Sequence, residues 1–308
     1  MKKFNLSILL FLIVVYNVAA QTGKTDLVRM ELKAAVQSME ERSFTAIDNF
    51  GKPVKGARAS ENSDHLFNKA GYHTEQDIYN QNGSLKVRYT YQYNASGLLE
   101  EQLLYNAGGS LKSKLNYRYS ANGNLVEQNQ YKPNGNLVTK YTYEYDAANH
   151  LMAYNWFNAT GMLDEKNKYE YDSRGNQVAA SSFNADGTLN SKAVFQYDTD
   201  GNIIKEEITA AADSLNILTV YVYDNRGKVI SKTGVNTDGT VYQKITCRYD
   251  AQGNLIEEVL FDKDSNKVDN YVFKYDYDKA GNWIKKLSYR NDLPATIVER
   301  EFTYYKGK

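Results

Sequence analysis

The chain repeats itself every 26 residues over most of its length. A fixed period of roughly 20 to 50 residues is typical of repeat architectures, and it outranks local propensity as a guide to fold. The chain is therefore expected to use one structural unit many times. An aromatic residue recurs at this spacing without a gap, at Phe67, Tyr93, Tyr119, Tyr145, Tyr171, Tyr197, Tyr223, Tyr249 and Tyr275.

Each period contains two turns. The first half reads Tyr-Asp-x-x-Gly-Asn-Leu, as at Tyr249 to Leu255, and the second reads aromatic-Asn-x-x-Gly, as at Phe183 to Gly187. The Asp or Asn side chain starts a turn by accepting a backbone N–H two residues on, and Gly adopts the left-handed conformation that follows. The residues that we assign to structural turns include Asp198, Gly201, Asp224, Gly227, Asp250, Gly253 and Asn149, where Asn149 replaces Gly because it tolerates positive φ.

Between the turns, polar and aromatic residues alternate. Tyr141, Tyr143 and Tyr145 share one face of a strand, with Thr142 and Glu144 on the other. About 18 strands in one meander exceed the roughly 10 that an open twisted sheet reaches without curling. We therefore predict an all-β domain over 67–305, in which tandem 26-residue β-hairpins form one long curled antiparallel sheet.

The first 20 residues have the features of a signal peptide. Lys2 and Lys3 precede an apolar run from Leu9 to Val15, and small residues end the segment at Ala20. Export is therefore expected, to the periplasm, the cell surface or the medium. After cleavage, no integral membrane segment is expected.

Residues 21–66 are expected to form an N-terminal cap segment. Within 24–42, apolar residues recur at helical spacing, and such a face must be buried. A short capping helix over the open end of the sheet satisfies that need. The apolar face consists of Val28, Leu32, Ala35, Val36 and Met39.

Charge and motifs exclude several function classes. The 37 basic and 37 acidic residues balance, whereas nucleic-acid binding requires a basic surface. The three histidines lack metal-ligand spacing, and Cys247 stands in a column of core aromatics. The acidic run at Asp262 has Lys267 where a calcium loop needs Gly. We predict no metal, no cofactor and no catalytic residue; a glycan-directed hydrolase is the least favoured alternative.

The aromatic residues supply the candidate binding site. Rows of Tyr can stack on sugar rings, although aromatics also favour a pleated, half-buried surface for structural reasons alone. Trp156 is in phase with polar positions of other repeats, such as Gln130 and Ser182, so it is expected to be exposed. The candidate ligand-binding residues are Trp156, Trp283 and Tyr154.

Tandem Tyr-Asp-x-x-Gly-Asn units resemble the YD repeats of bacterial Rhs-like cell-surface and secreted proteins. The resemblance covers roughly Phe67 to Tyr305. The sequence shows no recognisable counterpart of the self-cleaving core or the toxin domain of large members. It implies export and an association with carbohydrate binding and cell-surface contact. We therefore expect a non-enzymatic envelope or extracellular protein that binds a glycan or a cell-surface protein. The alternative is a structural or adhesion scaffold that acts through its sheet edges or self-association.

Overall fold

The computed structural model describes residues 24–59, 62–211 and 215–306. Most of them belong to one 21-stranded antiparallel sheet or to the turns that connect its strands, and the only helix in the described part is the four-residue α2 (Asp26–Arg29). No helix among the described residues has the length and apolarity to cross a membrane. The predicted signal peptide, residues 1–20, lies outside the described residues. The predicted all-β class and hairpin repeats are confirmed.

The strands follow one another as hairpins with short turns. Their bounds are β1(Val36–Asn49), β2(Lys52–Arg58), β3(Asn62–Phe67), β4(His73–Tyr79), β5(Leu85–Tyr93), β6(Leu99–Asn106), β7(Leu111–Tyr119), β8(Leu125–Tyr131), β9(Leu137–Tyr145), β10(Leu151–Phe157), β11(Leu163–Tyr171), β12(Gln177–Asn184), β13(Leu189–Tyr197), β14(Ile203–Ala210), β15(Leu215–Tyr223), β16(Val229–Val235), β17(Val241–Tyr249), β18(Leu255–Asp262), β19(Lys267–Tyr277), β20(Trp283–Arg290) and β21(Leu293–Tyr304).

The turns have a common geometry. At the turn between β17 and β18, one oxygen of Asp250 accepts the backbone N–H of Asn254 at 2.8 Å, and Gly253 has φ +88°. Asn149 takes the place of this glycine with φ +67°. Positive φ is nearly free of steric cost only for Gly, which explains why the repeat keeps it. The same geometry holds at Asp198 with Gly201 (φ +84°) and at Asp224 with Gly227 (φ +74°).

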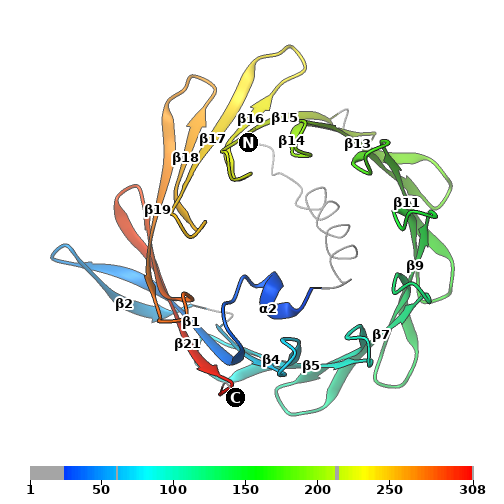
Figure 1. Ribbon diagram of the computed structural model, residues 1–308, viewed down its shortest axis with the longest axis horizontal. Helices are drawn as coiled ribbons and strands as arrows, with labels where there is room; N and C mark the ends of the chain where they lie inside the picture. Colours follow the sequence, from blue (N-terminus) through cyan, green and yellow to red (C-terminus); the bar gives the residue numbers. More distant parts are fainter. Residues whose placement is uncertain (1–23, 60–61, 212–214, 307–308) are drawn as a thin grey trace.

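The sheet closes on itself, which corrects the expectation of an open curled sheet. Twenty strands form a ring that Figure 1 shows end on. β1 completes the ring by pairing with β21 from Val36↔Tyr304 to Thr45↔Thr296, and with β3 on its other edge. Closure pairs the backbone groups that an open sheet would leave exposed along both outer strands.

The expected capping helix over 24–42 is wrong for most of its length. Only Asp26–Arg29 is helical, and Glu31 (φ +56°) and Ala34 (φ +61°) turn the chain out of the helix before β1 begins at Val36. From Val36 the chain instead forms a strand of 14 residues, most of which pair with neighbouring strands. Their backbone hydrogen bonds to the ring replace those of the expected helix, so long-range pairing outweighs the helical spacing of the apolar residues.

The tyrosine columns face the interior of the ring. Figure 1 shows α2 inside the ring beside β4. From there, Asp26 accepts a hydrogen bond from the Tyr93 hydroxyl at 3.0 Å, and Leu27 joins a buried cluster with Met39 and Phe67. Since side chains alternate along a strand, the residues in phase with Tyr93 and Phe67 line the interior. We call this surface the inner wall.

Candidate functional site

The inner wall carries a ladder of tyrosines bonded to polar side chains of neighbouring strands. The Tyr91 hydroxyl donates to the amide oxygen of Gln76 at 3.1 Å, and Tyr221 donates to the carboxylate of Glu206 at 2.6 Å. Corresponding bonds join Tyr117 to Gln102 (3.3 Å) and Tyr143 to Gln128 (3.4 Å). Burial raises the pKa of Tyr117 to about 12, so its hydroxyl remains a proton donor at neutral pH.

A second tyrosine column is tied to the backbone. The Tyr171 hydroxyl donates to the carbonyl of Leu151 at 2.9 Å, and Tyr249 donates in the same way to Val229 at 2.9 Å. Each bond spans 20 residues and joins the end of one strand to the start of the strand before it. These tyrosines are the regularly spaced residues of the 26-residue period. Their hydroxyls are therefore committed to holding adjacent strands together.

Trp156 and Tyr154 lie together on the inner wall within β10. Tyr154 is buried, and its ring centroid is 6.0 Å from that of Tyr143. Trp156 is half-buried and stacks on Tyr141 with centroids 6.4 Å apart and an interplanar angle of 17°. The expectation that Trp156 is exposed is therefore only partly met. Its repeat phase matches Gln130 and Ser182, but this column lines the inner wall, where Ile208 also stands.

Four polar atoms beside Trp156 have no hydrogen-bond partner among the described residues. They are Trp156 Nε1, Asn167 Oδ1, the Tyr169 hydroxyl and Ser182 Oγ. Asn167 and Ser182 are 0% exposed and Tyr169 is 1% exposed. Strand register places Asn167 opposite both Tyr154 and Ser182. Buried polar atoms are nearly always bonded, so this concentration of unbonded atoms is unusual.

Trp283 has a different environment, near the closure between β20, β21 and β1. The guanidinium carbon of Arg300 is 3.5 Å from the centroid of the Trp283 ring, and Lys286 Nζ is 5.6 Å from it. Arg300 also donates to Glu41 at 2.7 Å. Burial lowers the pKa of both Arg300 and Lys286. Cations thus already contact the Trp283 ring, whereas Trp156 contacts other aromatics.

Two histidines that the sequence pattern did not bring together form a buried pair. His65 Nδ1 and His73 Nε2 are 3.0 Å apart, Ser63 Oγ is 2.9 Å from His65 Nε2, and the backbone N–H of His73 donates to Asp26 at 2.8 Å. Burial lowers the pKa of His65 to about 3 and also lowers that of His73. Such a weakly basic imidazole is a poor general base for Ser63. The position of both histidines next to the turn at Gly71 is the sequence signal that would have paired them.

The described residues contain no group of three or more His, Cys, Asp or Glu side chains placed to hold a metal ion. Cys247 is buried on the inner wall, and burial raises the pKa of its thiol, which disfavours the reactive thiolate. The predictions that the chain is not an enzyme and uses no cofactor remain predictions.

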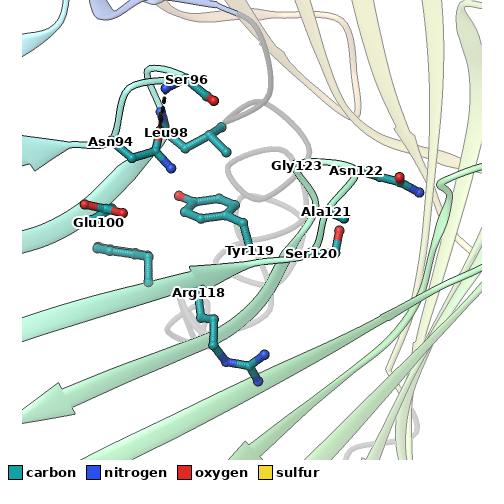
Figure 2. A pocket seen from close by; sticks show the side chains of 11 residues that line it. Asn94, Ser96, Leu98, Glu100, Arg118, Tyr119, Ser120, Ala121, Asn122 and Gly123 are labelled. Carbon is teal, nitrogen blue, oxygen red and sulfur yellow. Dashed lines mark hydrogen bonds between the residues drawn. The ribbon is translucent and has the colours of Figure 1, made fainter.

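A groove at the rim of the ring lies between two neighbouring turns (Figure 2). Its polar groups are largely used within the turns: Asn94 accepts the backbone N–H groups of Ser96 and Leu98 at 3.0 Å each, and the Tyr119 hydroxyl donates to Leu99 at 2.9 Å. The groove follows from the spacing of successive turns. The inner wall at Trp156, with its unbonded polar atoms, is the stronger candidate site.

Comparisons with known proteins give distant likenesses only. No protein-family model and no curated protein matches the chain. Similar solved structures include a TcdB2-TccC3-Cdc42 complex, at 14% identity and a TM-score of 0.34, which covers 87% of this chain and 18% of that one. They also include a porin-like protein from Bacteroides uniformis (12% identity, 88% and 99% coverage, TM-score 0.36) and a DUF1329 family protein from Desulfovibrio piger (11%, 96% and 93%, TM-score 0.20). At these scores the likeness carries no argument about function.

Proposed function

We propose that the protein is exported and acts without catalysis in the cell envelope or outside the cell, where its inner wall binds carbohydrate or a protein partner. The Tyr-Asp-x-x-Gly-Asn motif further supports kinship with YD-repeat proteins. The observation that carries the proposal is the inner wall itself. Its aromatic columns alternate with amide, hydroxyl and carboxylate groups around a closed ring of strands.

Carbohydrate is the ligand class that this surface suits best. A sugar ring offers an apolar face to an aromatic side chain and hydroxyls that both donate and accept hydrogen bonds at its edge. Tyr154 and Trp156 provide the rings, and Asn167 and Ser182 provide polar atoms that the protein leaves unbonded. Binding sites for small molecules commonly combine apolar walls with a few placed polar groups in this way.

Glycan-array binding tests the proposal. Wild type is compared with Trp156→Ala and with Trp156→Gln. The second variant carries the side chain that another repeat has at this position, at Gln130. Wild type is expected to bind at least one glycan, and both variants are expected to bind it more weakly while keeping the wild-type circular dichroism spectrum. Absence of binding to every glycan on the array would remove the carbohydrate half of the proposal.

The hairpin of β1 and β2 supports a second candidate function, a structural or adhesion scaffold. Within the described residues, β2 pairs only with β1, so its other edge is open. Phe50 at the tip is fully exposed, and Ile47 is 53% exposed. An open strand edge beside exposed apolar residues is suited to pairing with another chain.

Sedimentation and pull-down experiments distinguish this candidate. A scaffold is expected to self-associate or to capture a partner, and Phe50→Ser combined with Ile47→Lys is expected to abolish that association. A wild-type protein that is strictly monomeric and captures no partner would count against the scaffold. That outcome would not count against the proposal of glycan binding.

A further inference from the structure

We infer that the inner wall around Trp156 is a subsite for one unit of a neutral sugar chain. The inference rests on the proposed carbohydrate function and gives it a location and a ligand class. We use the name "Trp156 patch" for Tyr154, Trp156, Asn167, Tyr169, Ala180 and Ser182, which share the inner wall of three consecutive strands, β10, β11 and β12.

The first argument is hydrogen bonding. Trp156 Nε1 is a donor only, Asn167 Oδ1 is an acceptor only, and the hydroxyls of Tyr169 and Ser182 can do either. Buried polar atoms without a partner are destabilising in folded proteins. A bound molecule that carries hydroxyls can both donate hydrogen bonds to such atoms and accept them. A hydrocarbon ligand satisfies none of them, and a sugar satisfies both kinds.

The second argument is that the repeat changes at this place. Four neighbouring inner-wall positions of β12 and β13 carry small side chains, namely Ala180, Ser182, Ser191 and Ala193. At the position of Ala180, three other repeats carry Gln76, Gln102 and Gln128, the acceptors of the tyrosine ladder. Each of these glutamines lies 15 residues before the tyrosine that it accepts from. The residue 15 before Tyr169 is Tyr154, in the same repeat column, and the Tyr169 hydroxyl has no partner among the described residues.

The third argument is charge. Glu165 is the charged side chain opposite Trp156 on the inner wall, and it accepts a hydrogen bond from Asn167 Nδ2 at 2.8 Å. A carboxylate here disfavours an anionic sugar because like charges repel in a partly buried site. Trp156, which is half-buried beside the buried Tyr154, supplies the ring surface on which the apolar face of a neutral sugar can lie.

The test fills the patch with residues that other repeats tolerate. In other repeats, the position of Ser182 is occupied by leucine, at Leu104 and Leu260, so Ser182→Leu should retain the fold. Thr219→Leu is the matched control, because it also adds a leucine to the inner wall, but on β15. Another repeat carries leucine at this position, at Leu115. The neutral glycan that binds wild type most tightly on the array is titrated into each variant.

Trp156 serves as the spectroscopic probe in a Trp283→Phe background, in which it is the only tryptophan of the chain. The glycan is expected to shift the Trp156 emission, and Ser182→Leu is expected to weaken binding by about 100-fold or more, as loss of two or more hydrogen bonds implies. Thr219→Leu should bind as wild type does. Equal binding by wild type and Ser182→Leu would overturn the inference while the proposed function stands, whereas no glycan binding to wild type would defeat the proposed function itself.

Tyr169→Phe adds a readout that a merely structural role would not give. Phe195 and Phe273 stand at the same repeat position, so the change is compatible with the fold. Removal of an unbonded hydroxyl should leave stability unchanged or raise it, yet should weaken glycan binding about 10-fold. Tyr117→Phe, which removes a hydroxyl bonded to Gln102, should show the reverse, with reduced stability and unchanged binding. A Tyr169→Phe protein that is destabilised and binds normally would contradict the inference.

Discussion

At the scale of single residues, the turn between β6 and β7 separates backbone strain from crowding. Gly109 has φ +80° and no heavy atom within 4 Å of the position that a Cβ would occupy, while its neighbour Gly108 has no positive φ. Gly109→Ala is therefore expected to lower the free energy of unfolding by about 1–2 kcal/mol, the cost of the left-handed conformation for a residue with Cβ. The midpoint of urea denaturation measures this.

Gly108→Ala is the matched control for that prediction. It lies in the same turn and, because a Cβ restricts the unfolded chain, should be neutral or stabilising by up to about 1 kcal/mol. Equal destabilisation by the two substitutions would show that the turn does not require glycine for its conformation.

The histidine pair should make the protein sensitive to acid. Because burial lowers the pKa of His65 from 6.5 to about 3, the folded state favours the neutral ring, and the unfolded chain binds more protons between these values. Stability is therefore complete above pH 6.5 and falls as the pH drops toward 3, with roughly 2 kcal/mol lost between pH 7 and 5. The charged groups around His65 and His73 are Asp26, Arg29, Asp64 and Arg300.

Denaturation midpoints at pH 7 and pH 5 measure this dependence. His65→Phe removes the titrating ring. Phenylalanine already occupies this repeat position elsewhere, at Phe195. The midpoint of the variant should change less between the two pH values than that of wild type, although it starts lower because Ser63 and His73 lose a partner. A larger pH dependence in the variant would refute the assignment to His65.

At the scale of elements, the side-chain bond between the ends of adjacent strands depends on the regularly spaced tyrosines. Tyr171→Phe removes the hydroxyl that donates to Leu151 and leaves that carbonyl short of a partner. We expect the free energy of unfolding to fall by about 1 kcal/mol. Tyr169→Phe, two residues earlier on the same strand, removes a hydroxyl with no partner in the described structure and should not have this effect. Chemical denaturation of the two variants side by side gives the comparison.

The hairpins are also where sequence reasoning succeeds. Asp250 and Gly253 specify a turn through hydrogen bonding and φ within a few residues, and such local rules are visible in one sequence. The residues from Val36 to Thr45 illustrate the limit. Their apolar spacing suits a helix, but their partners on one edge lie more than 250 residues away in β21, and no local pattern encodes that pairing.

The candidate site shows the same division. The aromatic character of Trp156 and Tyr154 was evident from the sequence, but Asn167 and Ser182 were not singled out, since Asn and Ser are common on strands and in turns. Their importance comes from the registers Tyr154↔Asn167 and Asn167↔Ser182, together with the missing hydrogen bonds. The observable signal was the run of small residues at Ala180 and Ser182, where the repeat departs from its own pattern.

At the scale of the whole molecule, closure changes which parts of the sheet can meet other chains. An open meander of this length would expose two long edges, whereas the ring pairs β1 with both β21 and β3. Exposed edges favour association between chains. Closure at β1 should therefore control both stability and solubility, and the buried cluster that holds β1 in place is the point at which to test it.

Met39 is the residue with which to open the ring. It lies on β1 at 1% exposure, packed in the cluster with Leu27, Val36 and Phe67. Met39→Ala is expected to lower the free energy of unfolding by about 2–5 kcal/mol, the usual cost of such a cavity. It should also raise the fraction of oligomer in size-exclusion chromatography, because strain at β1 exposes the edges of β21 and β3.

Met162→Ala provides the control, because Met162 is 64% exposed and its loss should change stability by less than about 0.5 kcal/mol. Urea denaturation and size-exclusion chromatography are measured together on both variants and on wild type. If Met39→Ala is destabilised but stays monomeric at every denaturant concentration before the unfolding transition, closure at β1 does not protect the sheet edges. If its oligomer fraction rises while the main transition hardly moves, the ring opens locally at β1 before the hairpins themselves unfold.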